Sequence, residues 1–218
     1  MSDPTLKKLD VLVVSYGGVG TTFLMRFLQK YLTVNDPDDR DGLKHLHGVP
    51  QTLNPRTKII YIYGNPIHAA RSLFRRKYHH AQAKKNGNPS LLPLETTLVD
   101  YAKNGSDELY LTSQFKQWHD HFQHPNPILY IKYEAIHDHI PELLAFLELP
   151  RYLRIDFPKK RQRSSQTNDH SGPTNTQLEN IYAQLSQTID ALPATVSNND
   201  FPHCRMRVIK RSLTTIFP

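Results

Sequence analysis

The sequence predicts an α/β fold, a single-domain three-layer sandwich with a central parallel sheet. Apolar runs rich in β-branched residues recur at 10–16, 58–63 and 127–132, which is the pattern of buried strands. Amphipathic helical patterns lie between and after these runs. Strands that alternate with helices form parallel sheets with helices on both faces, and the carboxyl ends of such strands meet at one crevice.

The helical patterns predict the covering layers. Pro66 suits the first turn of its helix, because its missing N–H costs little there. Polar segments at 35–42 and 85–93 predict loops, and 158–175 is basic and turn-rich. Helices are expected at about 20–33, from Pro66 to about Tyr78, at 106–122, at 134–147 and at 177–192.

Length and composition bound the organisation. The 218 residues suffice for one domain, 1–218, with the informative motifs within 11–165 and a helix and tail at 174–218. No apolar run approaches the ~20 residues of a membrane span, and residues 1–10 lack the apolar core of a signal peptide. A single cysteine, Cys204, excludes an internal disulfide and predicts an inert thiol. The expectation is a cytoplasmic protein with no membrane span.

The charge distribution favours a small anionic ligand. The net charge is +7, from 27 basic and 20 acidic residues, with basic clusters at 71–77 and 159–163. Local clusters suit an anionic small molecule better than coating of a polyanion. No helix-turn-helix or zinc pattern supports nucleic-acid binding, so no nucleic-acid partner is expected.

A glycine turn follows the first strand. Gly17-Gly18-Val19-Gly20 leads into Thr21-Thr22, where a helical pattern opens. Glycines bring backbone N–H groups close to a phosphate or sulfate, and the helix N-terminus adds its own. A nucleoside triphosphatase P-loop needs Lys where Thr21 stands, which disfavours an ATPase or GTPase. A ParA-type nucleotide switch is the weaker alternative, and a plain turn in an α/β domain is the simplest one.

Three ordered segments resemble the sulfotransferases that use 3′-phosphoadenosine 5′-phosphosulfate (PAPS). The first is the stretch from Ser15 to Leu24, SYGGVGTTFL, against the family's S-Y-P-K-S-G-T-T-W-L. The second is the 58–63 strand followed by GNPIH at 64–68 and by Ser72, against R-N-P-x-D and a later Ser. The third is the 128–132 strand followed by Tyr133-Glu134 and by FLELP at 146–150.

The resemblance implies a P-loop-like phosphosulfate-binding turn and a role for each matched position. PAPS is the implied co-substrate, and no metal is expected. The resemblance implies that the 5′-phosphosulfate is bound by the two threonine hydroxyls and by the backbone of Gly17, Gly18, Val19, Gly20, Thr21 and Thr22. Adenine would pack on Phe23 and Tyr133. The 3′-phosphate would be bound by Ser72 and by a basic loop with Lys160, Arg161 and Arg163.

Two basic family positions are lost. The Lys of the first motif is Gly18 and the Arg of the second is Gly64, while the second motif's Asp is His68. Lys44 is the expected replacement cation for the leaving group, and Arg71, Arg75 or Arg76 for the 3′-phosphate. The alternative function is therefore a nucleotide-binding relative with impaired catalysis.

The general base is expected between the first two motifs. In many relatives a histidine there removes the acceptor proton, and a histidine pKa of ~6.5 suits that task. His47, followed by Gly48-Val49-Pro50, is the first candidate and His45 the second. Asp39 and Asp41 are further alternatives, because some carbohydrate-acting relatives use a carboxylate.

The predicted function is transfer of a sulfuryl group from PAPS to a hydroxyl or amine of a small-molecule or carbohydrate acceptor. Acceptor choice depends on loops 34–50 and 85–105 and on the tail, where 205–211 is either an edge strand or an acceptor-side element. Neither the acceptor nor the oligomeric state follows from the sequence. His119, His121 and His124 are expected to face solvent, because alternate helix positions point apart.

Overall fold

The strands form one sheet in the order β1-β2-β3-β4. The computed structural model describes residues 6–90, 92–120, 124–160 and 172–198. β1 (Val11–Ser15), β2 (Lys58–Tyr63) and β3 (Ile128–Lys132) are parallel, as predicted. β4 (Thr195–Ser197) pairs with β3 in the antiparallel sense and corrects the expectation of a purely parallel sheet. Three residues are too few for a periodic pattern to stand out in the sequence.

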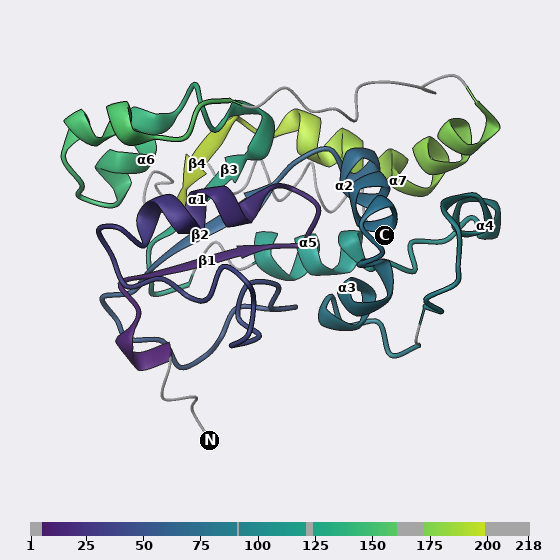
Figure 1. Cartoon of the computed structure of the whole chain (residues 1–218), viewed down its shortest axis with the longest axis horizontal. Coiled ribbons are helices and arrows are strands. Elements are labelled where there is room, and N and C mark those ends of the chain that lie inside the picture. The colour runs from purple at the N-terminus through teal and green to yellow at the C-terminus, as the bar shows by residue number, and fades with distance from the viewer. Residues whose placement is uncertain (1–5, 91, 121–123, 161–171, 199–218) are drawn as a thin grey trace.

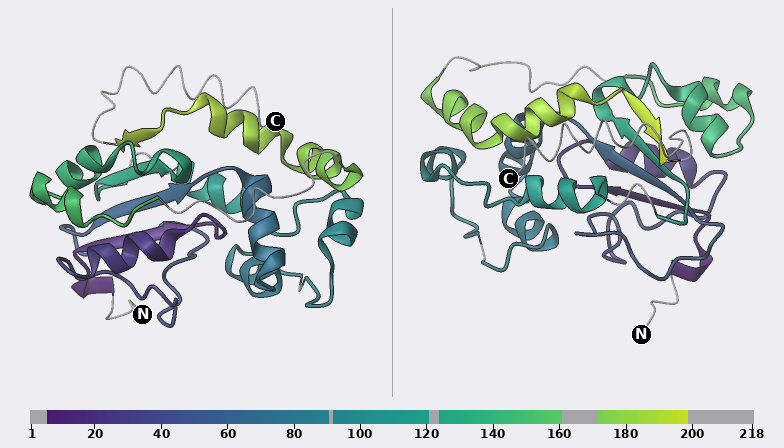
Figure 2. Two further views of the ribbon diagram at one scale, coloured as in Figure 1. Left: turned by 45° about the horizontal axis from the view of Figure 1, so that its top comes forward. Right: turned by 180° about the vertical axis from the view of Figure 1, so that it is seen from behind.

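Helices cover both faces of the sheet, and the fold is the expected three-layer α/β type. α1 (Thr21–Leu28) lies on one face, and α5 (Leu111–His119) lies on the other (Figures 1 and 2). The remaining helices and 3-10 turns are η1 (Leu6–Lys8), α2 (Pro66–Arg75), α3 (His79–Lys85), α4 (Leu98–Asn104), η2 (Tyr133–Ala135), α6 (Ile140–Phe146), η3 (Arg151–Asp156) and α7 (Pro173–Ala191). No helix of the described part has the length and apolar character that a bilayer crossing requires.

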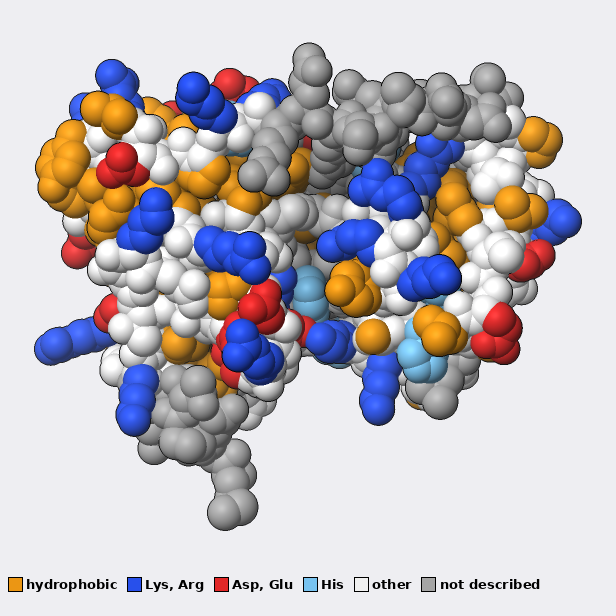
Figure 3. Space-filling view, in the orientation of Figure 1, with side chains coloured by type: hydrophobic (Ala, Val, Ile, Leu, Met, Phe, Trp, Pro, Cys, Tyr) orange, Lys and Arg blue, Asp and Glu red, His pale blue; other side chains and the backbone are white. Residues whose placement is uncertain are grey.

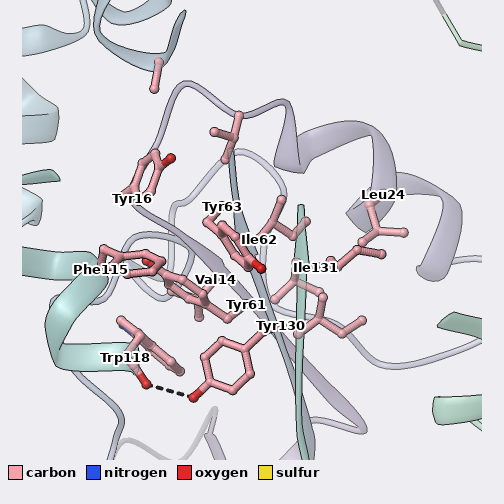
Figure 4. Packing of buried hydrophobic residues seen from close by; sticks show 14 of the residues in the cluster. Val14, Tyr16, Leu24, Tyr61, Ile62, Tyr63, Phe115, Trp118, Tyr130 and Ile131 are labelled. Carbon is pink, nitrogen blue, oxygen red and sulfur yellow. Dashed lines mark hydrogen bonds between the residues drawn. The ribbon is translucent and has the colours of Figure 1, made fainter. Parts of the chain in front are cut away.

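The core between the sheet and α5 is aromatic (Figure 4). Tyr61 of β2 stacks on Trp118 of α5 with ring centroids 5.4 Å apart and an interplanar angle of 13°. The Tyr130 hydroxyl donates to the Trp118 carbonyl at 2.8 Å, so the buried polar group is satisfied. Leu24 packs from the α1 side, so α1 is anchored to the sheet just behind the glycine turn.

Asn35 covers the middle of the outer edge of β1, between the Val11 bridge to Val34 and the bond from the Ser15 N–H to the Lys44 carbonyl. Its Oδ1 accepts from the Val13 N–H at 2.8 Å, and its Nδ2 donates to the Val13 carbonyl at 3.1 Å. One buried amide thus makes both hydrogen bonds that a further strand would make at this residue, which leaves less of the edge open to pairing with another chain.

Helix boundaries differ from the sequence-based expectation. The helix expected at 20–33 ends at Leu28, and the one expected at 106–122 spans only Leu111–His119. The region 134–147 holds the short turn η2 and then α6. α4 was not predicted, because its seven residues present only Tyr101 and Ala102 to the interior.

α2 stops before Tyr78, where a continuous helix was expected. The Tyr78 N–H donates to the Leu73 carbonyl and the Lys77 N–H to the Phe74 carbonyl, both at 2.9 Å. This pair of bonds is the Schellman arrangement that ends helices, with Lys77 at φ 56° where glycine is usual. α3 then starts in a new direction.

The expectation of solvent-facing histidines is wrong for His119. Its side chain is 5% exposed and stacks on Phe115, with ring centroids 5.4 Å apart. His124 is partly buried, and its Nδ1 accepts from the Asn126 N–H at 3.2 Å. His121 lies outside the described residues.

Candidate functional site

The glycine turn after β1 adopts a conformation that only glycines take easily. Gly17, Gly18 and Gly20 have φ values of 91°, 75° and 67°. Gly20 precedes α1, and no side chain caps the first turn of that helix. The N–H groups at the start of α1 are therefore available to an anion, and the helix dipole favours negative charge there.

Two hydroxyls close the loop at its base. Ser15 Oγ lies 2.7 Å from Thr21 Oγ1, and it accepts from the Gly17 N–H at 3.3 Å. Both side chains are buried. The Thr21 hydroxyl is thus engaged by Ser15 inside the turn.

The loop is backed by α2 and α3. A Cβ added to Gly18 would lie 2.6 Å from the Ala69 carbonyl oxygen, and one added to Gly17 would lie 2.5 Å from Gln82 Cδ. Asn86 is fully buried and donates to the Tyr16 carbonyl at 3.1 Å. Packing from behind therefore holds the loop in a single shape before any ligand binds.

Lys44 places a cation at the start of α1. Its ammonium donates to Thr22 Oγ1 at 2.7 Å and to the Pro37 carbonyl at 2.6 Å, and the residue is 8% exposed. Burial lowers the pKa of Lys44, and the negative charge of Asp39 opposes that shift. A buried ammonium beside the open N–H groups of a helix is suited to charge stabilisation of a phosphate.

His45 lies at the base of the same loop. Its Nδ1 is 2.9 Å from the Ser15 carbonyl oxygen, which can only accept, so Nδ1 carries the proton of the neutral ring. The lone pair is then on Nε2, the nitrogen that can take a proton from a substrate. Burial lowers the pKa of His45 to about 4, although the Ser15 carbonyl favours the charged form.

The lowered pKa of His45 predicts a pH-dependent stability. The unfolded ring binds a proton near pH 6.5, whereas the folded ring resists it down to about pH 4. The folded protein therefore loses stability as the pH falls from 6.5 to 4, by up to about 3 kcal/mol. Urea denaturation at pH 7.5 and 4.5 should show a smaller loss in His45→Gln than in the wild type.

Gln29→Ala, an exposed substitution that removes no titrating group, supplies the control for this comparison. It should keep the full pH-dependent loss of stability. Equal losses in His45→Gln and the wild type would contradict burial as the cause, since all other titrating groups are common to both proteins.

His47 lies against other elements. Its Nε2 is 3.2 Å from the Ser113 hydroxyl on α5, and a Cβ added to Gly87 would lie 2.9 Å from its ring. Of the two histidines that the sequence suggested, His45 is the one that contacts the glycine loop.

The two carboxylate alternatives hold the surrounding turns together. Asp39 accepts from the Lys44 N–H at 3.0 Å and pairs with the Lys85 ammonium. Asp41 accepts from the N–H groups of Asp36 at 2.6 Å and Leu43 at 3.1 Å. Both carboxylates therefore position the segment that carries Lys44.

The end of β2 meets the glycine turn, as the strand-end argument predicted. The Tyr16 hydroxyl donates to the Gly64 carbonyl and accepts from the Gly64 N–H at 2.9 Å. Glu134, which follows β3, accepts from the Asn65 N–H at 3.0 Å. The Asn65 side chain caps α2 by accepting from the His68 N–H at 3.0 Å. The carboxyl ends of all three parallel strands thus meet in one place.

Gly64 is bordered by the side chain of Glu134, whereas Gly18 is bordered by the backbone of Ala69. A Cβ on Gly64 would lie 2.8 Å from Glu134 Oε2, the end of a flexible side chain, and the backbone there does not need glycine. The carboxylate of Glu134 therefore lies where the family motif would bring an Arg, which places negative charge on this side of the crevice.

The residues matched to the adenine side form an aromatic group. Phe23 packs edge-on against Tyr133, with centroids 6.1 Å apart, and is stacked at 5° on His137. Gly20 lies under the Tyr133 ring, because a Cβ there would be 2.4 Å from Cε2. The Tyr133 ring therefore borders the glycine turn at Gly20.

The cations on α2 fall on different sides of that helix. Ser72 is half-buried, and its carbonyl accepts from Arg76 Nε at 3.1 Å. The positive charge of Arg76 contributes to lowering the pKa of Lys44. Arg71 and Arg75 face another groove, described below. The described residues do not include Arg161, Arg163, Cys204 or the segment 205–211.

The family of this chain follows from a match to a family model. The model for the sulfotransferase domain matches residues 43–182, well over half of the chain. The chain belongs to the sulfotransferase family.

The other comparisons add little to this assignment. One similar solved structure is the crystal structure of mouse sulfotransferase SULT7A1 complexed with PAP, whose sequence is 18% identical to this one. The alignment covers 95% of this chain and 82% of that chain, with a TM-score of 0.43. No curated protein matches.

The sequence did not indicate four buried polar residues that hold the glycine turn and the neighbouring segments in place in this sulfotransferase-family chain. They are Ser15, Asn35, Gln82 and Asn86. Ser15 stood inside the quoted first motif, but the partner of its hydroxyl depends on the fold of the loop. Asn86 belongs to a KNGN stretch whose composition indicates a turn and nothing more. Among the described residues, no three His, Cys, Asp or Glu side chains are arranged to hold a metal ion.

Proposed function

We propose that this sulfotransferase-family chain transfers a sulfuryl group from PAPS to a hydroxyl or amine of a small-molecule or carbohydrate acceptor, in the cytoplasm. The observation that carries the proposal is the hydrogen bond from the buried Lys44 ammonium to the Thr22 hydroxyl, at the start of α1 directly after the glycine turn. Family members have a lysine at the position of Gly18. Lys44 reaches the same loop from another segment, so the cation is present although the motif lacks it.

The glycine loop fits the phosphosulfate end of PAPS. Gly17, Gly18 and Gly20 turn the backbone tightly, and α1 begins without a side-chain cap. Backbone N–H groups at such a turn hold the oxygens of phosphate or sulfate. Phe23 and Tyr133 offer flat apolar surface for adenine beside the loop.

His45 is the proposed general base. Its Nε2 takes the proton from the acceptor hydroxyl or amine while the acceptor atom forms a bond to sulfur and the sulfur–oxygen bond to the phosphate breaks. Negative charge then grows on the phosphate oxygen that leaves, and Lys44 with the loop N–H groups stabilises it. The products are the sulfated acceptor, the protonated His45 and adenosine 3′,5′-bisphosphate, which balances atoms and charge.

A second candidate is a nucleotide-binding relative with impaired turnover. The observation that favours it is Glu134, whose carboxylate lies against Gly64 and Asn65. A negative group near the 3′-phosphate weakens nucleotide binding, and the loss of one charge-assisted hydrogen bond costs about 1.5–3 kcal/mol.

Sulfated-product formation from PAPS, followed with a panel of alcohols, amines and sugars, tests the proposal. We expect turnover, and we expect His45→Gln to lower kcat by about 10²–10⁴-fold with unchanged affinity for adenosine 3′,5′-bisphosphate. His47→Gln is the matched comparison and should retain most of the activity, since His47 is held against α5.

Calorimetry with adenosine 3′,5′-bisphosphate separates the two candidates. Tight binding without turnover on any acceptor would favour the impaired relative. Binding of ATP or GTP without any binding of the bisphosphate would overturn both.

A further inference from the structure

A second groove opens on the far side of α2 from the glycine loop. Its volume is about 670 Å³. Ala69 faces the loop, where it limits the space at Gly18. Residues two, five and six positions after Ala69 fall on the opposite side of the helix, and these are Arg71, Phe74 and Arg75, which line the groove. This surface, called here the α2 groove, is therefore separate from the crevice at the strand ends.

The walls of the α2 groove are partly apolar. The Phe74 ring stacks on His79, with centroids 4.3 Å apart and an interplanar angle of 9°. The opposite wall is the segment 94–98, where the Leu94 side chain is 58% exposed and Leu98 begins α4. Phe74 and His79 are themselves buried, at 8% and 2% exposure, so the apolar surface open to a ligand comes from Leu94 and the half-buried Leu98.

The charge of the α2 groove is positive. Arg71, Arg75 and Lys77 line it, against the single carboxylate of Glu95. Arg71 donates to Asn175 Oδ1 at 2.8 Å, whereas Arg75 and Lys77 are exposed and form no ion pair within the described ranges. Figure 3 shows Lys and Arg side chains gathered, with apolar ones among them, over the half of the molecule that carries α2 and α3. This combination is complementary to an anion with an apolar body.

His79 adds an unsatisfied polar atom to this wall. The residue is 2% exposed, and its Nε2 donates to the Leu94 carbonyl at 3.1 Å. The Nδ1 atom is buried and has no hydrogen-bond partner in the part of the chain that is described. Because Nε2 carries the ring proton, Nδ1 is an acceptor and contributes no contact to an anionic group.

Lys77 occupies a position that glycine would fill at lower energy. Its φ of 56° lies in the left-handed region, which is unfavourable for a residue with a Cβ. The Schellman bonds at the end of α2 do not involve its side chain. The lysine side chain therefore contributes nothing to ending the helix, and it presents a cation to the groove instead.

We propose that the α2 groove binds an organic anion, with its apolar body against Leu94 and Leu98 and its sulfate, carboxylate or phosphate group at Arg75 and Lys77. This site is distinct from the crevice of the proposed transfer reaction and does not depend on that function.

Binding of 1-naphthyl sulfate to the full chain tests the proposal, with neutral 1-naphthol as the matched compound. Titration calorimetry is done with and without adenosine 3′,5′-bisphosphate. We expect saturable 1:1 binding of the sulfate in both conditions and at least tenfold weaker binding of the naphthol. Arg75→Gln and Lys77→Gln should each weaken binding by about tenfold, because each removes a charge-assisted contact. Lys30→Gln, on exposed surface beyond α1, should have no effect.

Lys77→Gly separates a ligand contact from a structural role. This variant relieves the left-handed backbone, so its melting temperature should rise while its affinity for 1-naphthyl sulfate falls. Binding that is unaffected by Arg75→Gln and Lys77→Gln, or equal affinity for naphthol and its sulfate, would overturn the proposal whether or not sulfuryl transfer is found.

Discussion

Replacement of Lys44 by glutamine should lower the rate of sulfuryl transfer by about 10²–10³-fold, the usual loss when one donor to a developing charge is removed. Lys44 holds the cation at the glycine loop in place of the family lysine, and its ammonium contacts Thr22 at 2.7 Å. Glutamine can still donate to Thr22 and to the Pro37 carbonyl, so the segment should keep its shape. The measurement is kcat and KM with PAPS, together with the Kd of adenosine 3′,5′-bisphosphate.

Stability distinguishes a chemical role of Lys44 from a structural one. The buried ammonium bonds to neutral oxygens and has no ion pair among the residues described, so its desolvation is only partly offset, by the charges of Asp39 and Asp38. Lys44→Gln should therefore melt at the same temperature as the wild type or higher, while its activity falls. Lys30→Gln is the control for a lost surface charge. Activity within about threefold of wild type in Lys44→Gln would remove the main support for the proposed function.

Restoring the family lysine at position 18 should damage the protein rather than improve it. The φ of Gly18 is 75°, and any Cβ there would lie 2.6 Å from the Ala69 carbonyl oxygen and 2.7 Å from its Cα. Both contacts are with backbone atoms in α2, which cannot move aside as the end of a flexible side chain can. Gly18→Lys should therefore displace the loop, destabilise the fold and abolish nucleotide binding.

A pair of alanine variants isolates the contact from the backbone conformation. Gly42 has a φ of 70° with nothing within 4 Å of an added Cβ, so Gly42→Ala should cost only the left-handed backbone, about 1–2 kcal/mol. Gly18→Ala should cost a further 1–3 kcal/mol, roughly the penalty for overpacking. Urea denaturation of the two variants measures the difference. Equal costs, or tighter nucleotide binding in Gly18→Lys, would show that the loop has room for a side chain.

The strands and the position of the site could be predicted because their signals are local. β2 and β3 match the expected apolar runs, and the glycine turn follows β1 where the pattern broke. Parallel strands bring their carboxyl ends together, so Gly20, Gly64 and Tyr133 were expected in one place and lie there. Helix lengths were predicted less well, because ends such as the turn at Lys77 depend on single residues in unusual conformations.

By itself the sequence determined the α/β class, the strand order in the chain, the glycine turn and the family. Each of these follows from residues that are neighbours or repeat at a short period. Only the tertiary structure decided that Lys44 reaches Thr22, that His45 rather than His47 contacts Ser15, and that Gly18 is closed off by Ala69. These contacts join residues from separate loops and helices. Their geometry is set by how the elements pack against one another, and a local sequence pattern does not specify the distance between residues that are far apart in the chain.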